Sequence, residues 1–501
     1  MSEPVIVELR KKSGPPALFV ADRPVPGFPE IEARIEESIS YQLRVSTIFW
    51  GGGRSTCGVG EIILVNTDHA LDSLLFDYDY IGGECLIRYG WDTLAFTGII
   101  QNVATRGEGR VALTISDKSH IFERGIAQNL YASGEHVGRI MPVTVGLCHS
   151  VPALLTDAAN LRFSFHDTTA VVPSTVRDQG VVLTPNTQWQ SVNVPPHHGF
   201  RLLQASAGRI TCDVLQGTDG SIAECITQLL QRLQFSSYVA SEINGLNSLY
   251  SFQGRMGLYI DGAMTYRAAF DLIADSIGGY WYCDREGYFR IRRLELPSTS
   301  PDLILDDTDL VGDVEVEFDA APGLTTTLCA LRNWHVHGPS ELAGSVRDTA
   351  IGALLMKDYR FRTSFTPHPI YQAGQGLTGA RRDVPQSTLV RPTLSPSIGG
   401  AQRPESDHGQ GTLFAMPLSC NQEANRRATL YGGPRYFWRV RSIIGATGVL
   451  TLRPGQTVQI TVRRSSKGTV FGLVDHRLLL IGIRGEIGSN IAELTLWGPA
   501  P

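Results

Sequence analysis

Hydrophobic positions recur with a helical period in one region of the chain, between residues 219 and 294. Two segments there repeat every 3.6 residues, which predicts two short amphipathic helices. Thr265 stands where it can cap the second helix, and Gly278 and Gly279 follow where that helix must end. The apolar faces are Ile222, Ile226, Leu229, Leu230 and Leu233 in the first helix, and Tyr266, Ala269, Phe270, Ile273 and Ile277 in the second.

A tight aromatic hairpin is predicted directly after the second helix. Its strands would be residues 280–283 and 288–292, joined by a turn of about four residues at 284–287. The two helices and the hairpin together predict a small α+β module without a nucleotide-binding loop. Such a module is unlike the commonest enzyme folds, and it favours a structural or assembly protein.

Elsewhere apolar and polar residues alternate with a period of two, which predicts β-strands. Closely spaced antiparallel strands of this kind usually close into a small barrel or sandwich. A further short helix is predicted at 422–431. The predicted strands cover residues 5–9, 61–66, 85–90, 95–100, 111–115, 171–172, 181–183, 201–203, 436–442, 458–463, 478–483 and 492–497.

We therefore predict a mainly β, multi-domain fold with a small α+β module and two β-barrel-like tube domains. The first barrel-like domain would cover 1–135, and a β-rich inserted domain 136–215. The helix–helix–hairpin module would cover 216–300, and the second barrel-like domain 301–501. A stretch rich in Pro, Gly, Ser and Gln interrupts the last domain at 362–411, which predicts a long loop or arm.

Composition narrows the classes of function. The 501 residues suffice for roughly three to four domains, and 42% hydrophobic content supports sizeable cores. Net charge is −5, and basic runs such as Arg381-Arg382 and Arg463-Arg464 are short, so the chain lacks the footprint of a protein that grips nucleic acid. No signal peptide or spanning apolar run of about 18 residues is evident. We expect a soluble protein made in the cytoplasm.

Metal binding has few candidates. The eight cysteines include no Cys-x-x-Cys pair, which predicts free thiols. His335 and His337 would face the same way on a strand and could reach one ion, but a third ligand is not evident nearby. We therefore expect ordinary surface histidines and no metal site. His197 and His198 are adjacent, so on a strand their rings would point to opposite faces.

The acidic pairs and the glycine-rich stretch of the chain do not match the catalytic motifs of known enzyme classes. Asp77 and Asp79 would share a face of an extended segment, as the paired carboxylates of a glycosidase do. Turn chemistry is the simpler explanation for these residues and for the cluster Asp306, Asp307 and Asp309. The glycine-rich stretch Gly51, Gly52, Gly53, Arg54 and Ser55 lacks the end of a phosphate-binding loop and predicts a flexible hairpin loop. We expect no catalytic residues and no cofactor.

Three groups of short segments carry a resemblance to a known family. One group lies in the first predicted barrel, at residues 60–66, 71–72, 87–90, 96–100 and 113–117. The second is the stretch 210–214 with the helix–helix–hairpin after it, and the third is residues 452–458 and 494–498. In this order they resemble the first domain, the middle module and the closing barrel of the baseplate hub (tail tip) proteins of long-tailed bacteriophages and gene transfer agents.

This resemblance implies a structural virion protein of the tail baseplate, assembled in the bacterial cytoplasm. Family hubs are homotrimers, and three chains with two barrels each give six near-equivalent positions for a six-fold tail tube or distal tail protein. The resemblance also implies contacts with a tail fibre or central tip protein, a part in host attachment, and passage of DNA at genome ejection without specific binding. The family has no catalytic residues to transfer.

Two alternatives remain open from the sequence. The first is a cell-wall or capsule glycan hydrolase that uses Asp77 and Asp79. The second is a glycan- or receptor-binding tail module in which Trp91, Trp281 or Tyr282 stacks on sugar, although such aromatic residues more often belong to a core.

Overall fold

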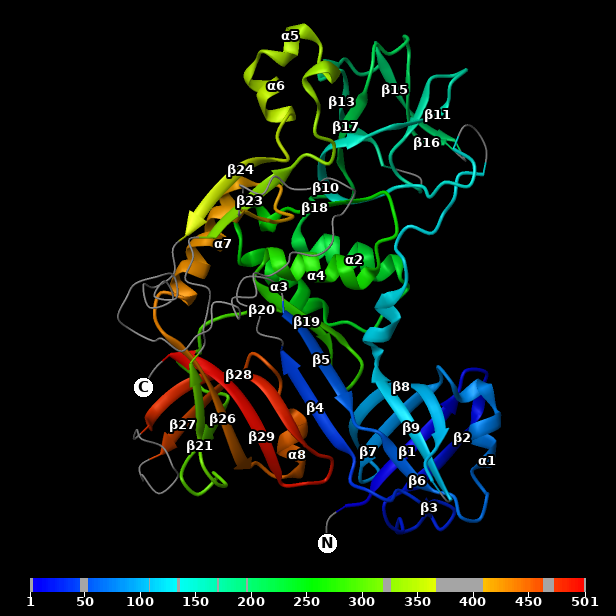
Figure 1. Cartoon of the computed structure of the whole chain (residues 1–501), viewed down its shortest axis with the longest axis vertical. Coiled ribbons are helices and arrows are strands. Elements are labelled where there is room, and N and C mark those ends of the chain that lie inside the picture. The colour runs from blue at the N-terminus through cyan, green and yellow to red at the C-terminus, as the bar shows by residue number, and fades with distance from the viewer. Residues whose placement is uncertain are drawn as a thin grey trace.

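The computed structural model describes residues 3–45, 53–107, 109–132, 136–168, 171–194, 197–318, 326–365, 409–462 and 473–499. The fold is mainly β, with several sheets and a few short helices, as predicted. Two β-rich bodies lie side by side at one end of the molecule (Figure 1). The longer helices lie in the middle, and a second group of strands, with short helices beside it, lies at the far end.

The first body is a closed barrel. Its strands are hydrogen-bonded in the order β3-β2-β1-β7-β8-β9-β6. The ring closes because Ile35 bridges Leu64 and the Val65 amide donates to the Arg34 carbonyl at 2.7 Å. Its elements are β1 (Val5–Lys11), β2 (Gly14–Ala21), β3 (Glu32–Ala33), β6 (Ile62–Val65), α1 (Asp72–Phe76), η1 (Tyr78–Tyr80), β7 (Glu84–Tyr89), β8 (Thr93–Thr105), β9 (Arg110–Asp117) and η2 (Lys118–Glu123).

The second body is built from the end of the chain. Strand β21 and the segment after it close this body. Leu303–Leu305 of β21 pair with β27, and further along the chain the Val311 amide donates to the Arg441 carbonyl of β26 at 2.8 Å. The four strands predicted here are confirmed. The elements are β21 (Leu303–Leu305), β22 (Glu315–Phe318), β26 (Arg435–Ile443), α8 (Ala446–Thr451), β27 (Thr457–Val462), β28 (Leu473–Glu486) and β29 (Ile491–Pro499).

A hairpin from the first third of the chain joins the two bodies. It consists of β4 (Ser40–Val45) and β5 (Gly53–Val59). One edge of β28 pairs first with β27 and then, from Gly482 to Glu486, with β4. On its other side β5 runs parallel to β19 (Gly279–Cys283) of the helical module. One sheet therefore connects three regions that are far apart in sequence.

The helical module contains the predicted helices and hairpin. α2 (Ile222–Arg232), α4 (Tyr266–Ser276) and the hairpin of β19 and β20 (Phe289–Arg293) confirm those predictions. The predicted cap is also present, because Thr265 Oγ1 accepts a hydrogen bond from the Ala268 amide at 3.2 Å. Helix α3 (Ala240–Ser248) was not predicted, and it buries only two apolar side chains. The other elements are η3 (Ser251–Gly254) and β18 (Gly257–Ile260).

Removing the Thr265 cap tests how far local signals stabilise this module. Thr265→Ala leaves an orphan amide in the first turn of α4, and we expect a loss of about 1 kcal/mol. Hydrogen exchange of the α4 amides in the native protein measures this loss locally. Thr265→Ser keeps the accepting oxygen and serves as the control. Equal exchange rates in both variants would contradict a capping role.

The inserted region extends the module away from the barrels. Within the described residues its strands form two sheets, ordered β14-β13-β17-β10-β18 and β11-β12-β16-β15, with β18 contributed by the module. The strand predicted at 171–172 is wrong, since pairing begins at Pro173. The strands are β10 (Val143–Pro152), β11 (Leu154–Asp157), β12 (Arg162–Ser164), β13 (Pro173–Asp178), β14 (Val181–Leu183), β15 (Trp189–Val194), β16 (His197–Leu202) and β17 (Ile210–Leu215).

Residues 326–365 and 409–430 leave the second barrel and lie beside the module and the inserted sheets (Figure 1). The helix predicted at 422–431 is longer than expected and begins at Pro417. Residues 366–408 of the predicted arm, including Arg381 and Arg382, lie outside the described residues. The elements are β23 (Thr326–Arg332), η4 (Pro339–Glu341), α5 (Gly344–Arg347), α6 (Ala350–Leu355), β24 (Tyr359–Phe365), β25 (Gly409–Gly411) and α7 (Pro417–Leu430).

Candidate functional site: an uncovered polar face of the joining sheet

The sheet that joins the barrels has one buried and one polar face. Along β4, Tyr41, Leu43 and Val45 are buried, whereas Gln42 and Arg44 between them are exposed. The same alternation runs through the second half of β26 and the first part of β29, whereas β28 has a buried run from Leu478 to Ile483 before the exposed Arg484. We call the outward set the polar sheet face. It consists of Gln42, Arg44, Glu315, Arg439, Arg441, Arg484, Glu493 and Thr495.

Charges alternate across this face. Arg484 lies opposite Glu493 on the neighbouring strand, and Glu493 lies opposite Arg441 on the strand after that. At the sheet edge Arg439 lies 3.5 Å from Glu315 and 3.3 Å from Glu317, in exposed ion pairs worth only about 0.2–1 kcal/mol each. Opposite charges on facing strands stabilise the pairing without neutralising the surface. The face is therefore a hydrated, charge-patterned surface.

The polar sheet face is also concave. A cavity of about 420 Å³ lies over it, lined by four arginines and three carboxylates, a net charge of +1. Its lining offers hydrogen-bond donors and acceptors in almost equal measure, and it has neither a buried apolar pocket nor a nucleophile next to a base. This chemistry suits a protein surface of matching charge pattern better than a small substrate.

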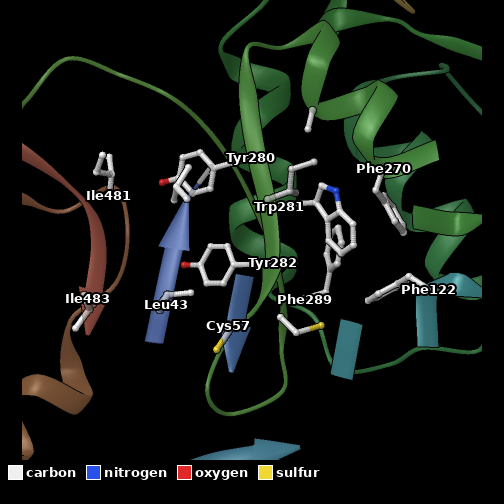
Figure 2. Close-up of a cluster of buried hydrophobic side chains, with 14 of the residues drawn as sticks. Leu43, Cys57, Phe122, Phe270, Tyr280, Trp281, Tyr282, Phe289, Ile481 and Ile483 are labelled. Carbon is white, nitrogen blue, oxygen red and sulfur yellow. The ribbon is translucent and has the colours of Figure 1, made fainter. Parts of the chain in front are cut away.

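Beneath the joint lies the aromatic hairpin of the module. Tyr280 and Tyr282 stack with ring centroids 6.2 Å apart and point toward Leu43 of β4 and Ile481 and Ile483 of β28 (Figure 2). These side chains are all buried. Burial raises the pKa of both phenols, so they stay neutral. Each barrel is thus packed against the module as well as against the other barrel.

The opposite side of the hairpin packs on the helices. Trp281 lies within 5.8 Å, centroid to centroid, of Phe122, Phe270 and Phe289. Its indole Nε1–H donates to Asp271 Oδ1 at 2.8 Å. Trp281 is 2% exposed and Tyr282 is 0% exposed. The proposed stacking of these two residues on sugar is therefore wrong, because neither ring face reaches solvent.

Trp91 is the one of the three candidate aromatic residues that reaches the surface. It is 43% exposed, and one of its faces stacks on Phe28 at 4.4 Å with an interplanar angle of 9°. It lies in the turn between β7 and β8 and does not line the cavity over the polar sheet face.

The predicted carboxylate pair has structural partners. Asp77 Oδ2 lies 2.6 Å from Lys11 Nζ, and its Oδ1 accepts from the Asp79 amide at 3.0 Å. Asp79 Oδ2 accepts hydrogen bonds from the amide and hydroxyl of Ser13. The hydrogen bond from Lys11 lowers the pKa of Asp77, whereas a general acid of a glycosidase needs a raised one. The pair therefore caps and anchors a turn.

The other polar candidates also lie in turns and strands. Asp306 accepts from the Thr308 amide at 2.8 Å and donates its own amide to Asp309 at 2.9 Å, which makes the cluster with Asp307 a turn. In the glycine-rich stretch, Gly53 to Ser55 belong to strand β5 rather than to a loop. Gly51, Gly52, Arg463 and Arg464 lie outside the described residues.

The histidines His335 and His337 lie in the segment after β23 rather than on a strand, and they are brought together with a third residue. His335 and His337 have ring centroids 4.7 Å apart, and Glu341 Oε2 lies 2.9 Å from His335 Nε2. His337 is 2% exposed, so the prediction of surface histidines is wrong for it. Sequence reasoning missed Glu341, although Gly338 and the proline after it mark a turn that returns the chain. His197 and His198 begin β16, away from this cluster.

All eight cysteines are buried free thiols, as predicted. Burial raises the pKa of the thiols of Cys85, Cys148 and Cys420, which makes these cysteines poor nucleophiles. None of the helices in the described part of the chain has the length and apolar content needed to cross a bilayer.

No family model and no curated protein matches this chain. Solved structures do align with it over nearly its whole length. A tail protein of Neisseria meningitidis is 12% identical, with a TM-score of 0.42, over 99% of this chain and 96% of that one. A prophage tail protein of Shewanella oneidensis is 10% identical, with a TM-score of 0.41, over 99% and 98%. A prophage tail protein of Listeria monocytogenes is 8% identical, with a TM-score of 0.41, over 99% and 94%.

Proposed function

We propose that this chain is a non-enzymatic structural protein of a phage-type tail, and within the tail the baseplate hub. The observation that carries the proposal is the sheet that fixes two closed barrels side by side in one chain. Barrel closure leaves few open strand edges, which suits a protein that must assemble in a defined way. The resemblance of both barrel sequences and of the module between them to hub proteins supports the same role.

The joint gives the two barrels a fixed spacing. β4 pairs with β28 along Gly482 to Glu486, and the aromatic hairpin fills the space beneath. In a homotrimer such a chain would present six barrels at regular intervals around a ring. A ring of that kind would dock on a six-fold tail tube or distal tail protein on one side. On the other side it would hold a tail fibre or central tip protein.

The polar sheet face is our candidate for the contact between neighbouring subunits. Its charges alternate and nearly cancel, which favours a matching protein surface over a polyanion. DNA would then pass the ring without specific binding, in keeping with the net charge of −5. The segment predicted as an arm, 362–411, is our candidate for the contact with a neighbouring tail component, and its residues 366–408 lie outside the described part of the chain.

The mass of the purified protein in solution tests this proposal. We expect light scattering to give a trimer of the 54.7 kDa chain and negative-stain images to show a ring. Arg441→Glu combined with Arg484→Glu places three carboxylates in a row with Glu493. We expect this variant to lose the trimer at low salt and keep its fold, because the substituted side chains are exposed.

The matched control reverses two exposed arginines elsewhere. Arg106 lies on the first barrel and Arg347 on α5, and each forms a surface ion pair. Arg106→Glu combined with Arg347→Glu changes the net charge by the same amount and should leave the trimer intact. A wild-type protein that is monomeric at every concentration and forms no ring on isolated tails would contradict the hub proposal. A trimer that persists after the charges of Arg441 and Arg484 are reversed would contradict only the proposed interface.

A further inference from the structure

Two histidines and a glutamate meet where the segment after β23 folds back onto the inserted sheets. The backbone places both rings: the His335 amide donates to the Ser150 carbonyl at 2.8 Å, and the His337 amide donates to the Leu355 carbonyl at 3.1 Å. The turn of η4 then returns Glu341 toward them. The positions of the three side chains are therefore fixed by strand and turn hydrogen bonds from different parts of the chain.

The donor atoms converge on one point. His335 Nε2 and His337 Nδ1 lie 2.9 Å and 4.0 Å from Glu341 Oε2, and the three ligand atoms all lie within 4.8 Å of one another. Ligands held at 2.0–2.1 Å from a tetrahedral Zn²⁺ ion lie about 3.3 Å apart. The widest observed separation, up to 4.8 Å, exceeds that value by about 1.5 Å, which two side chains can share.

One of the three ligand atoms faces the site and has no hydrogen bond within the described part of the chain. His337 has a fully buried side chain, and its Nδ1 has no hydrogen-bond partner among the described residues. Its other ring nitrogen, Nε2, faces Thr211 Oγ1 at 3.4 Å. That contact orients the ring with Nδ1 toward His335 and Glu341. A buried imidazole nitrogen without a partner is costly unless something binds it.

The residue types also suit a cation. Imidazole nitrogens and carboxylate oxygens are ligands that zinc and related divalent metals accept in proteins.

Two arginines lie near the site, and they leave one side of the Glu341 carboxylate for a metal ion. Arg209 Nε lies 3.8 Å from Glu341 Oε1, the carboxylate oxygen that points away from the histidines. Arg177 lies further off and is paired with Asp213 at 2.6 Å. The three ligand atoms therefore face one another on the side of Glu341 that is turned away from Arg209.

We infer that His335, His337 and Glu341 form a binding site for a divalent transition metal of the zinc class. Two imidazoles and one carboxylate fill three positions of a tetrahedron, and water would take the fourth. The outer contacts are those usual for such ligands, a hydroxyl on His337 and a backbone amide on Glu341. The ion would tie the η4 turn to the segment that runs along β10 and β17. This inference is independent of the proposed hub role.

Metal titration of the full chain, with any histidine tag removed and any bound metal stripped by chelation, tests the inference. We expect one Co²⁺ per chain with visible d–d bands of a tetrahedral site, displaced by one Zn²⁺. Glu341→Gln and His337→Gln should each weaken Zn²⁺ binding at least about 100-fold, as much as or more than removal of an outer-shell partner does. Glu341 is partly exposed, so its substitution leaves the fold intact.

The control is a surface pair of the same two residue types. His69 lies 3.4 Å from Asp72 but is exposed and lacks a second histidine. His69→Gln should bind Zn²⁺ as the wild type does. With Zn²⁺ bound, we also expect slower hydrogen exchange of residues 335–341 in the wild type and no change in Glu341→Gln. A wild type that binds no metal, or a Glu341→Gln variant that binds it equally well, would overturn the site.

Discussion

Glu423→Ala is expected to destabilise the protein by about 3–5 kcal/mol, because it leaves two arginines buried without their counter-charge. Glu423 on α7 is 0% exposed. Its Oε1 accepts from Arg427 Nε at 2.5 Å, and its Oε2 accepts from Arg426 Nε at 2.9 Å and from the Tyr250 hydroxyl at 2.7 Å. Urea unfolding followed by tryptophan fluorescence measures the loss.

The arginines of this cluster join α7 to the module. Arg427 Nη2 donates to the Asp275 carbonyl at 2.6 Å, and Arg426 Nη2 donates to the Ile277 carbonyl at 3.1 Å, both at the end of α4. Positive charge there satisfies the orphan carbonyls and the negative end of the helix dipole. Removing Glu423 would therefore loosen a contact between residues about 150 positions apart in sequence.

The pH dependence gives a second measurement on the same cluster. Burial by itself raises the pKa of Glu423, but the charges of Arg426 and Arg427 outweigh it, and the native pKa lies below the ordinary value. A group with a lowered native pKa stabilises the fold above its unfolded pKa of about 4.3. That stability is lost as the pH falls through the native pKa. The wild type should therefore lose stability below pH ~4 more steeply than Glu423→Gln.

An exposed ion pair provides the control for this prediction. Arg439 and Glu317 lie 3.3 Å apart on the surface of the second barrel, with about half or more of each side chain exposed. Glu317→Ala should cost less than about 1 kcal/mol. A Glu423→Ala protein that loses no more than this control would contradict the role assigned to the buried cluster.

Local patterns predicted the elements of this fold well, since they depend on neighbours in sequence. The 3.6-residue period gave α2 and α4, and the period of two gave most strands of both barrels. Capping preferences predicted Thr265 as the first cap of α4, and turn chemistry predicted the turn before Tyr288. α3 escaped because its apolar face contains only Ile243 and Leu246, which is too short a stripe to show a period.

Long-range pairing could not be predicted in this way. The alternation in β4 marks a strand, but nothing in residues 40–45 indicates that its partner is β28, more than 400 positions away. The same holds for the parallel pairing of β5 with β19. Parallel or distant partners depend on how whole domains pack, which a window of neighbouring residues does not contain. The polar sheet face was therefore invisible in the sequence.

The histidine cluster shows a similar limit at the level of a site. The i, i+2 spacing of His335 and His337 predicted that they share a side, but their burial depends on β17 and on α6, which cover them. Glu341 completes the set only because the turn at Gly338 reverses the chain. A turn signal between a histidine pair and an acidic residue is the local feature that could have indicated it.

Trp281→Ala is the second substitution from which we expect a large effect, about 3–5 kcal/mol of lost stability. The indole is buried between Phe122, Phe270 and Phe289, and its N–H donates to Asp271. Truncation leaves a large cavity and an acceptor without its donor. It also loosens the hairpin on whose other side the β4–β28 joint packs (Figure 2). Thermal unfolding and the mass in solution measure both consequences.

Trp91→Ala is the matched control, since Trp91 is 43% exposed and stacks on Phe28 at 4.4 Å and on Phe19 at 6.2 Å. We expect it to cost less than Trp281→Ala, because aromatic pairs of this kind contribute about 0.5–1.5 kcal/mol each. If the joint needs the aromatic core, Trp281→Ala should lower the melting temperature and weaken the trimer together, whereas Trp91→Ala should lower the melting temperature less and leave the trimer intact. A Trp281→Ala protein that melts like the wild type but loses binding on a glycan array would contradict this, and would return the sugar-binding alternative to consideration.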